Sequence, residues 1–462
     1  MARFPRKTML AAALYLAAMA AMEWIPGLDW HRAPSAATLS AILRNPPPSP
    51  PRAEPPPDPA PKPKEPTAGP MRPPVEVPRR PDFVSAPGKP RITDPAGSLA
   101  PFFAAMRRAE ERQPGAVVRV LHYGDSPTTA DSITGDVRLL LQRRFGDAGH
   151  GFLLIAKPWA WYGHHGVGLK AEGWIAEPSS HIGRARDSLH GLGGVNFIGY
   201  FGAYSQVTLP GAPATRVEIH YLRQPGGGEF KVEAGGRQVL TESSAGAEKS
   251  PGYASGEVAG GADSFKLTVT RGGVRLYGWN FENYGPGVVY SSIGLNGASV
   301  QTLVNYFDEK QWGDQLRRGK PALVVLNYGS NESVSKDYVE KYYTGELRKL
   351  AARVRSALPD TPILIMSPMD RGERDKTGGI ATVPTVPRIV EIQRQVALET
   401  GSAFFDTFAA MGGSGTMAQW YAATPRLVSA DFLHPTPGGA ARVGALLEQA
   451  LLESYGRWKA AQ

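Results

Sequence analysis

The fold is decided by the stretch Val117-Val118-Arg119-Val120-Leu121-His122-Tyr123-Gly124-Asp125-Ser126. Its apolar part predicts a buried strand over residues 116–123, and the Gly-Asp-Ser that follows marks the end of that strand. A second apolar run, residues 322–326, is followed in the same way by Asn327-Tyr328-Gly329-Ser330-Asn331. Because the carboxyl ends of the strands form the ligand-binding edge of an open α/β sheet, we expect both polar turns to lie at that edge.

A third polar signal is Asp431-Phe432-Leu433-His434. An aspartate three residues before a histidine can fold back so that its carboxylate meets one ring nitrogen, which leaves the other nitrogen as a proton acceptor. A serine is a weak nucleophile until such a base takes its proton, so Ser126, His434 and Asp431 together predict an acyl-transferring serine hydrolase. Each motif alone could be an ordinary capped turn, and only the combination favours catalysis.

These motifs, with Gly294-Leu295-Asn296-Gly297-Ala298 between them, resemble the four sequence blocks of the SGNH (GDSL-type) hydrolases. The resemblance covers residues 101–155 and 280–455. It implies a flavodoxin-like three-layer α/β/α domain with Ser126 as nucleophile, His434 as base and Asp431 as the group that orients the base. It also implies an oxyanion hole made by the backbone N–H groups of Ser126 and Gly297 and the side-chain amide of Asn331.

The chain departs from the family pattern in three places. Pro127 follows the serine, Asn296 stands where a small residue is common, and Gly329-Ser330-Asn331-Glu332 replaces the more usual Gly-Thr-Asn-Asp. None of the three departures removes a catalytic atom, although Pro127 removes one backbone donor near the site.

The sequence changes character between residues 156 and 278, where glycine-rich turns separate short alternating runs. Period-two alternation of this kind predicts an inserted β-sandwich inside a hydrolase domain formed by residues 99–155 and 279–462. The strands that we expect in it are 215–222, 229–234, 237–240, 264–270 and 273–277.

An insertion at this place resembles the peptidoglycan O-acetylesterases, whose inserted domain is carbohydrate-binding-like. Near its start, Trp159, Trp161 and Tyr162 offer flat rings that suit sugar faces, and we consider them candidate substrate contacts. Packing of these rings in the core or in an interdomain seam is the alternative.

Composition limits the possible partners and cofactors. The 462 residues carry a formal net charge of +9 and contain no cysteine, which excludes disulfides and thiolate metal sites. The basic excess suits an anionic membrane surface or an acidic polymer such as cell-wall glycan. There is no basic helix interleaved with aromatic residues, so we do not expect nucleic-acid binding. His164-His165 has no carboxylate at ligand spacing, and we expect neither a metal nor a cofactor.

The N-terminus predicts export. Arg3, Arg6 and Lys7 precede the apolar stretch 9–24, which is typical of a signal peptide or an uncleaved signal anchor over residues 1–24. Residues 25–98 are rich in proline and predict a disordered linker. We therefore expect a periplasmic protein, tethered to the inner membrane if the signal stays uncleaved.

Together these features predict an exported serine esterase that removes O-acetyl groups from cell-envelope polysaccharide, above all peptidoglycan. An O-acetyltransferase would use the same triad with a sugar hydroxyl in place of water, and no sequence feature separates the two. The third hypothesis is a glycan-binding protein without activity. The complete set of Ser126, Asp431 and His434 argues against it.

Overall fold

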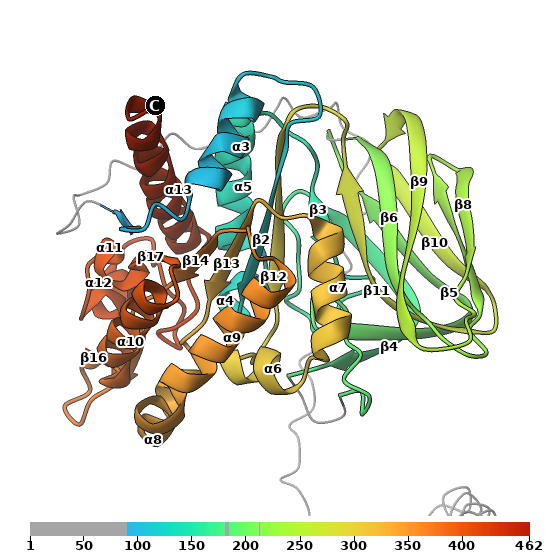
Figure 1. The fold of residues 1–462 in the computed structure, drawn as a ribbon. Coiled ribbons are helices and arrows are strands. Elements are labelled where there is room, and N and C mark those ends of the chain that lie inside the picture. Colours follow the sequence, from blue (N-terminus) through green and yellow to red (C-terminus); the bar gives the residue numbers. More distant parts are fainter. Residues whose placement is uncertain (1–89, 181–183, 212) are drawn as a thin grey trace, which may run out of the picture. The chain divides into compact units, whose positions relative to one another are not determined.

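The computed structural model describes residues 90–180, 184–211 and 213–462. A six-stranded sheet forms the central layer of an α/β/α domain (Figure 1). Its strands, in spatial order, are β1 (Ile92–Thr93), β17 (Ala403–Phe405), β14 (Ile363–Met366), β13 (Leu323–Asn327), β2 (Val117–Gly124) and β12 (Gly287–Gly294). All neighbouring strands are parallel except β1, which pairs with β17 in the antiparallel sense. Numbered along the chain, the parallel strands have the order 2-1-3-4-5, which is that of flavodoxin.

Helices cover both faces of this sheet, as expected for an α/β/α domain. One face carries α3 (Ala100–Glu110), α5 (Ser132–Phe145) and α13 (Pro437–Ala460), and the other carries α7 (Glu309–Gly319), α9 (Thr344–Ala357) and α10 (Thr385–Glu399) (Figure 1). Along β2, Val118 and Val120 pack under the first group of helices, whereas Leu121 and Tyr123 pack under the second. Burial on both faces explains the unbroken apolar run of this strand.

Shorter elements connect these layers. They are α4 (Ser126–Thr129), α6 (Val300–Asn305), η1 (Glu332–Val334), α8 (Lys336–Tyr338), η2 (Val339–Tyr343), α11 (Thr407–Met411), α12 (Thr416–Ala422) and the hairpin of β15 (Gly372–Arg374) and β16 (Ile380–Thr382).

The inserted module is all-β and antiparallel. Its strands are β3 (Gly151–Leu153), β4 (Gly168–Pro178), β5 (Val195–Thr208), β6 (Ala214–Arg223), β7 (Glu229–Ala234), β8 (Arg237–Ser243), β9 (Ser250–Ala262), β10 (Ser264–Arg271) and β11 (Gly273–Glu282). They form one hydrogen-bonded sheet rather than two separate sheets, with β8 and β9 at its ends. The sheet curls so far that a Cβ on Gly256 of β9 would lie 3.3 Å from the carbonyl oxygen of Val239 in β8.

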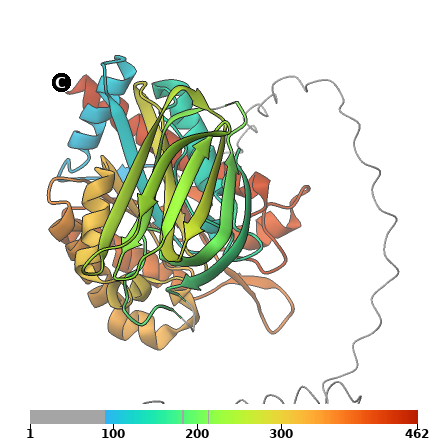
Figure 2. The same cartoon turned by 90° about the vertical axis from the view of Figure 1, so that its right-hand side faces the viewer.

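The module lies against the α/β/α domain and shares its core (Figures 1 and 2). One continuous cluster of buried side chains joins Phe152 and Trp279 of the module to Leu121 and Tyr123 of β2. The strands of the module begin at β3 and end with β11, slightly outside the expected boundaries 156 and 278.

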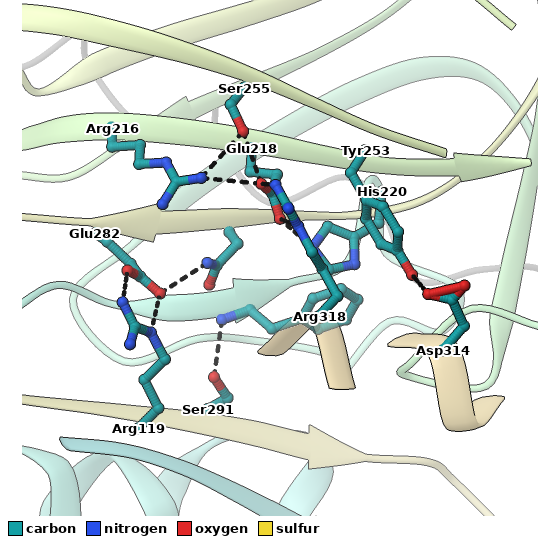
Figure 3. Close-up of polar contacts among 12 residues, drawn as sticks. Arg119, Arg216, Glu218, His220, Tyr253, Ser255, Glu282, Ser291, Asp314 and Arg318 are labelled. Carbon is teal, nitrogen blue, oxygen red and sulfur yellow. Dashed lines mark hydrogen bonds and ion pairs between the residues drawn. The ribbon is translucent and has the colours of Figure 1, made fainter. Parts of the chain in front are cut away.

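Ion pairs add a polar seam between the two parts (Figure 3). Arg119 of β2 binds Glu282 of β11 through two hydrogen bonds of 2.8 and 2.6 Å. Arg318 of α7 binds Glu218 of β6, whose carboxylate also accepts a hydrogen bond of 2.6 Å from Ser255. The four charged side chains of these ion pairs line a cavity of about 220 Å³.

Within the described part of the chain, no helix combines the length and apolar character that a membrane span requires. The predicted signal segment 1–24 lies outside the described residues, as does all of the predicted linker 25–98 except its last residues. The prediction is wrong at the end of the linker, because Ile92–Thr93 form β1 of the sheet and the ordered domain therefore begins before residue 99. The signal segment and the rest of the linker remain predictions.

Candidate active site

Strand register brings the predicted motifs to one edge of the sheet. Gly124 at the end of β2 lies directly opposite Gly294 of β12 on one side and Asn327 of β13 on the other. Ser126, Gly297 and Asn331 follow these three positions within a few residues. The loops that carry them therefore leave the sheet side by side at its carboxyl edge, as the sequence predicts.

The two strand-end glycines let the chain after Ser126 pack tightly on the sheet. A Cβ on Gly124 would come within 2.1 Å of Thr128 Oγ1, and a Cβ on Gly294 would come within 2.4 Å of the Thr129 nitrogen. Any side chain at either position would push α4 away from the sheet and move Ser126 with it.

His434 connects the two other members of the predicted triad. Its Nε2 lies 2.7 Å from Ser126 Oγ, and its Nδ1 lies 2.6 Å from Asp431 Oδ2. With Nδ1 protonated and hydrogen-bonded to the carboxylate, Nε2 is the acceptor that faces the serine. The structure thus brings Ser126 together with the Asp431–His434 pair, whose histidine lies 308 residues later in the chain, in the geometry expected to activate a serine hydroxyl.

A tight turn sets the position of Asp431. Its Oδ1 accepts hydrogen bonds from the backbone N–H groups of Leu433, at 3.1 Å, and His434, at 3.0 Å. Phe432, which directly follows Asp431, has a φ of +55°. Its carbonyl accepts a hydrogen bond of 2.9 Å from Gly372 N at the start of the β15–β16 hairpin. Partial burial acts to raise the pKa of Asp431, but the hydrogen bonds from His434 and Leu433 outweigh it and lower the pKa. Asp431 is therefore a carboxylate at neutral pH.

The second predicted oxyanion donor, Gly297, lies in a turn that closes through a hydrogen bond of 3.1 Å from Ala298 N to Leu295 O. Gly297 has a φ of +70°, which places it in the left-handed region that favours glycine. Among the described residues, no backbone carbonyl accepts a hydrogen bond from its N–H group.

Asn331 joins the loop of β13 to the loop of β12. Its Nδ2 donates to the Ala298 carbonyl at 2.7 Å, and because an amide nitrogen carries two hydrogens, one more donor remains. Glu332, the next residue, fixes both loops by accepting hydrogen bonds from Val300 N at 2.8 Å and Gly329 N at 3.0 Å.

Two buried carboxyl groups lie directly behind this edge. Burial raises the pKa of Asp125 to about 7, and the negative charge of Glu332 raises it further. Hydrogen bonds from Ser330 act in the opposite direction but are outweighed. Burial likewise raises the pKa of Glu332 to about 7, although its two backbone hydrogen bonds act to lower it. Asp125 thus has a buried position in the core, and the carboxylate that contacts His434 is that of Asp431.

The three aromatic candidates for substrate contact lie in different surroundings. Tyr162 is buried and its hydroxyl accepts a hydrogen bond of 2.8 Å from Leu154 N, so its ring belongs to the core. Trp159 packs partly buried against the same core, with its ring nearly perpendicular to that of Tyr162. Trp161 is 57% exposed and is the only one of the three whose ring is open to a ligand.

Behind these rings lies an ion pair that sequence reasoning missed. Asp131 and Arg138 are both buried and 2.6 Å apart, and Asp131 also accepts a hydrogen bond of 2.8 Å from His165 N. His164 Nδ1 lies 3.6 Å from the same carboxylate. Within the described residues, no group of three or more potential ligands is arranged to hold a metal ion.

Comparisons with known proteins agree with this geometry. Residues 258–442 match the model of the GDSL-like lipase/acylhydrolase family. No curated protein sequence matches the chain significantly. A solved structure of a peptidoglycan O-acetylesterase superposes with a TM-score of 0.69 at 22% identity, covering 79% of this chain and 99% of that one.

Two further solved structures are much more distant. A salicylyl-acyltransferase from a tetracycline biosynthetic pathway has a TM-score of 0.29 at 12% identity, with 65% of this chain and 98% of that one covered. A family two carbohydrate esterase from Clostridium thermocellum, in complex with cellohexaose, has the same score and identity, with 63% and 100% covered. At TM-scores this low, neither structure says anything about the activity of this chain. Residues 258–442 thus resemble a GDSL-like lipase/acylhydrolase domain, and the 2-1-3-4-5 sheet to which they contribute has the strand order of a flavodoxin-like α/β/α fold.

Proposed function

We propose that the protein is a serine esterase that removes O-acetyl groups from cell-envelope polysaccharide, with peptidoglycan as the leading substrate. The observation that carries the proposal is the position of His434, whose two ring nitrogens contact Ser126 and Asp431 at the same time. The choice of peptidoglycan is supported by the fold shared with a peptidoglycan O-acetylesterase over 79% of this chain.

In the first half of the proposed reaction, Ser126 Oγ attacks the acetyl carbonyl carbon while its proton moves to His434 Nε2. The negative charge that develops on the carbonyl oxygen is stabilised by the N–H groups of Ser126 and Gly297 and by the Asn331 amide. When the carbonyl re-forms, the bond to the sugar oxygen breaks and that oxygen takes the proton from His434. The sugar leaves with a free hydroxyl, and Ser126 carries the acetyl group.

In the second half, a water molecule attacks the acetyl-serine and gives its proton to His434. Collapse of this intermediate returns the proton to Ser126 Oγ and releases acetate. Asp431 remains ionised throughout and stabilises the protonated ring of His434. Its lowered pKa is consistent with that role.

The exposure of the triad supports a polymeric substrate. The side chains of His434 and Asp431 are 41% and 50% exposed, so the reacting atoms lie at an open surface rather than in a deep pocket. An acetyl group that projects from a long glycan can reach such a surface without the chain having to enter the protein.

We also propose that the protein acts outside the cytoplasm. The proposal is supported by the basic and apolar N-terminal sequence and by a substrate that lies in the cell envelope.

The direct test is to incubate the purified protein with O-acetylated peptidoglycan and to measure released acetate, with Ser126→Ala as the control. We expect acetate release by the wild type and a loss of at least about 1000-fold in the variant. Release of acetate only when a sugar acceptor is absent, with transfer of the acetyl group when one is present, would instead identify a transferase. Equal activity of Ser126→Ala and wild type would refute the triad.

A further inference from the structure

The peptide bond between Asn296 and Gly297 is the central peptide of a type II turn. The turn runs from Leu295 to Ala298, Gly297 has a φ of +70°, and Asn296 has no positive φ. In this peptide the Asn296 carbonyl and the Gly297 N–H point in opposite directions, because both lie in one planar unit. The direction of the carbonyl therefore determines where the proposed oxyanion donor points.

A turn of this kind has an alternative conformation. Types I and II differ chiefly by a rotation of the central peptide through about 180°, and a glycine at the third position can adopt either. After such a rotation, the Asn296 carbonyl oxygen would replace the Gly297 N–H at the site. It would then repel the negative charge that develops during the reaction instead of stabilising it.

The inserted module holds this peptide in one orientation. Ser180, which follows β4 of the module, donates a hydrogen bond of 2.6 Å from its Oγ to the Asn296 carbonyl. The neighbouring chain is fixed, since Ser179 N donates to Gly194 O at 2.8 Å. A Cβ on Gly194 would come within 2.8 Å of Leu295 Cδ2, so this segment packs directly on the turn.

We propose that Ser180 is a positioning residue for the oxyanion hole, supplied by the inserted module. Its hydroxyl holds the Asn296 carbonyl away from the reacting atoms and thereby aims the Gly297 N–H at the oxyanion. A hydrogen bond to the carbonyl also polarises the peptide and strengthens its N–H as a donor. The inference rests on the proposed function, in which Gly297 stabilises the negative charge.

The matched test compares Ser180→Thr with Ser180→Val, because the two side chains have nearly the same shape and only threonine keeps the hydroxyl. We expect Ser180→Val and Ser180→Ala to lower kcat for p-nitrophenyl acetate by about 10-fold with little change in KM, since the affected interaction strengthens in the transition state. Ser180→Thr should restore most of kcat. Ser255→Ala removes a module hydroxyl that donates at 2.6 Å to Glu218 of the seam instead of to the turn, and it should leave kcat unchanged.

A second readout separates positioning from stability. Inactivation by diethyl p-nitrophenyl phosphate places a phosphoryl oxygen in the oxyanion hole, so its rate should fall in parallel with kcat in Ser180→Val. Equal kcat in the valine and threonine variants, or losses that follow only the melting temperature, would overturn the proposal. If Ser126→Ala abolishes activity while the Ser180 variants do not change it, only this inference fails and the proposed esterase stands.

Discussion

In the proposed reaction, Ser126 depends on groups that reach it from three other segments of the chain. The proposed base is His434, and the proposed oxyanion donors come from the turn at Gly297 and from Asn331. Because the attacking oxygen and the developing oxyanion lie on the same carbon, each group must be placed to within a fraction of an ångström. The strand-end glycines 124 and 294 make that placement possible, since any Cβ there would displace α4.

The first residue-level prediction concerns Asn331. If its amide donates to the oxyanion, Asn331→Ala should lower kcat by roughly 100-fold or more with little change in KM, because the interaction strengthens in the transition state. Kinetics normalised to active-site titration measure this effect. As a control, Asn280→Ala removes an amide that donates to Glu282 at 3.0 Å in the seam and should spare kcat. If Asn331→Ala lost stability at unchanged kcat, Asn331 would only stabilise the two loops and would not donate to the oxyanion.

The second prediction concerns Asp125, whose pKa burial raises to about 7 in the folded protein. A carboxyl group with a raised pKa stabilises the fold fully below its unfolded value of about 4, and this contribution is lost as the pH rises through about 7. The stability of the wild type relative to Asp125→Asn should therefore fall by more than about 1 kcal/mol between pH 5 and pH 8. Urea unfolding of both proteins at several pH values measures the difference. Parallel stability curves would show that Asp125 does not titrate in this range.

Among the elements, the sequence predicted the strands that carry the site better than it predicted the module. Strands β2 and β13 are buried on both faces and end at recognisable polar turns. Their apolar runs therefore predicted the strands, and the observed sheet register places their polar turns side by side, as expected. The module strands β6, β7, β8, β10 and β11 were also expected, whereas β3, β4, β5 and β9 were missed. Glycine bulges explain two of the omissions, because Gly173 in β4 and Gly202 in β5 have positive φ and interrupt the alternation. In β9, repeated glycines weaken the same pattern.

Ser180 was missed for a different reason. A single serine after a strand carries no motif, and its partner lies 116 residues away. The glycan-contact candidates show the same limit, because the sequence could not distinguish the exposed ring of Trp161 from the buried ring of Tyr162.

A prediction for the seam between the elements concerns Glu218. Burial acts to raise its pKa, but the His220 ring, 3.2 Å away, and Arg318 outweigh burial and lower it. Its charge therefore stabilises the fold above about pH 4.5, and that contribution is lost as the pH falls. At neutral pH, Glu218→Gln should cost about 1–2 kcal/mol, a value reduced because the Arg318 and Arg216 side chains are 39% and 34% exposed.

The matched control for this variant is Glu257→Gln. Glu257 is 57% exposed and lies 3.7 Å from the same Arg216, so its loss should change the free energy of unfolding by less than about 0.5 kcal/mol. Urea unfolding measures both variants. Equal effects would mean that the seam contributes no more than an ordinary surface pair.

For the molecule as a whole, the sequence predicted two kinds of structure but not how they join. Alternating runs indicated a β-module and buried runs indicated an α/β domain, since each pattern depends on local burial. Whether the two share a core depends on which faces meet, and that information is spread over residues as distant as Leu121 and Trp279. The predicted export signal and linker stay as sequence-based predictions.

The shared core leads to a final prediction about cooperativity. Trp279 of β11 is fully buried, stacks on Phe281 at 5.5 Å, and belongs to the same cluster as Leu121 and Tyr123 of the catalytic sheet. Trp279→Ala should cost about 3–5 kcal/mol. Because the module and the hydrolase domain pack on each other, we expect this loss of stability to lower the melting temperature of a single unfolding transition. Esterase activity and module structure should be lost together in that transition. Calorimetry, with residual activity measured after each heating step, tests this expectation. If the module of Trp279→Ala melted first while activity on p-nitrophenyl acetate survived, the module would be an independent attachment, and its hold on the oxyanion turn through Ser180 would be dispensable.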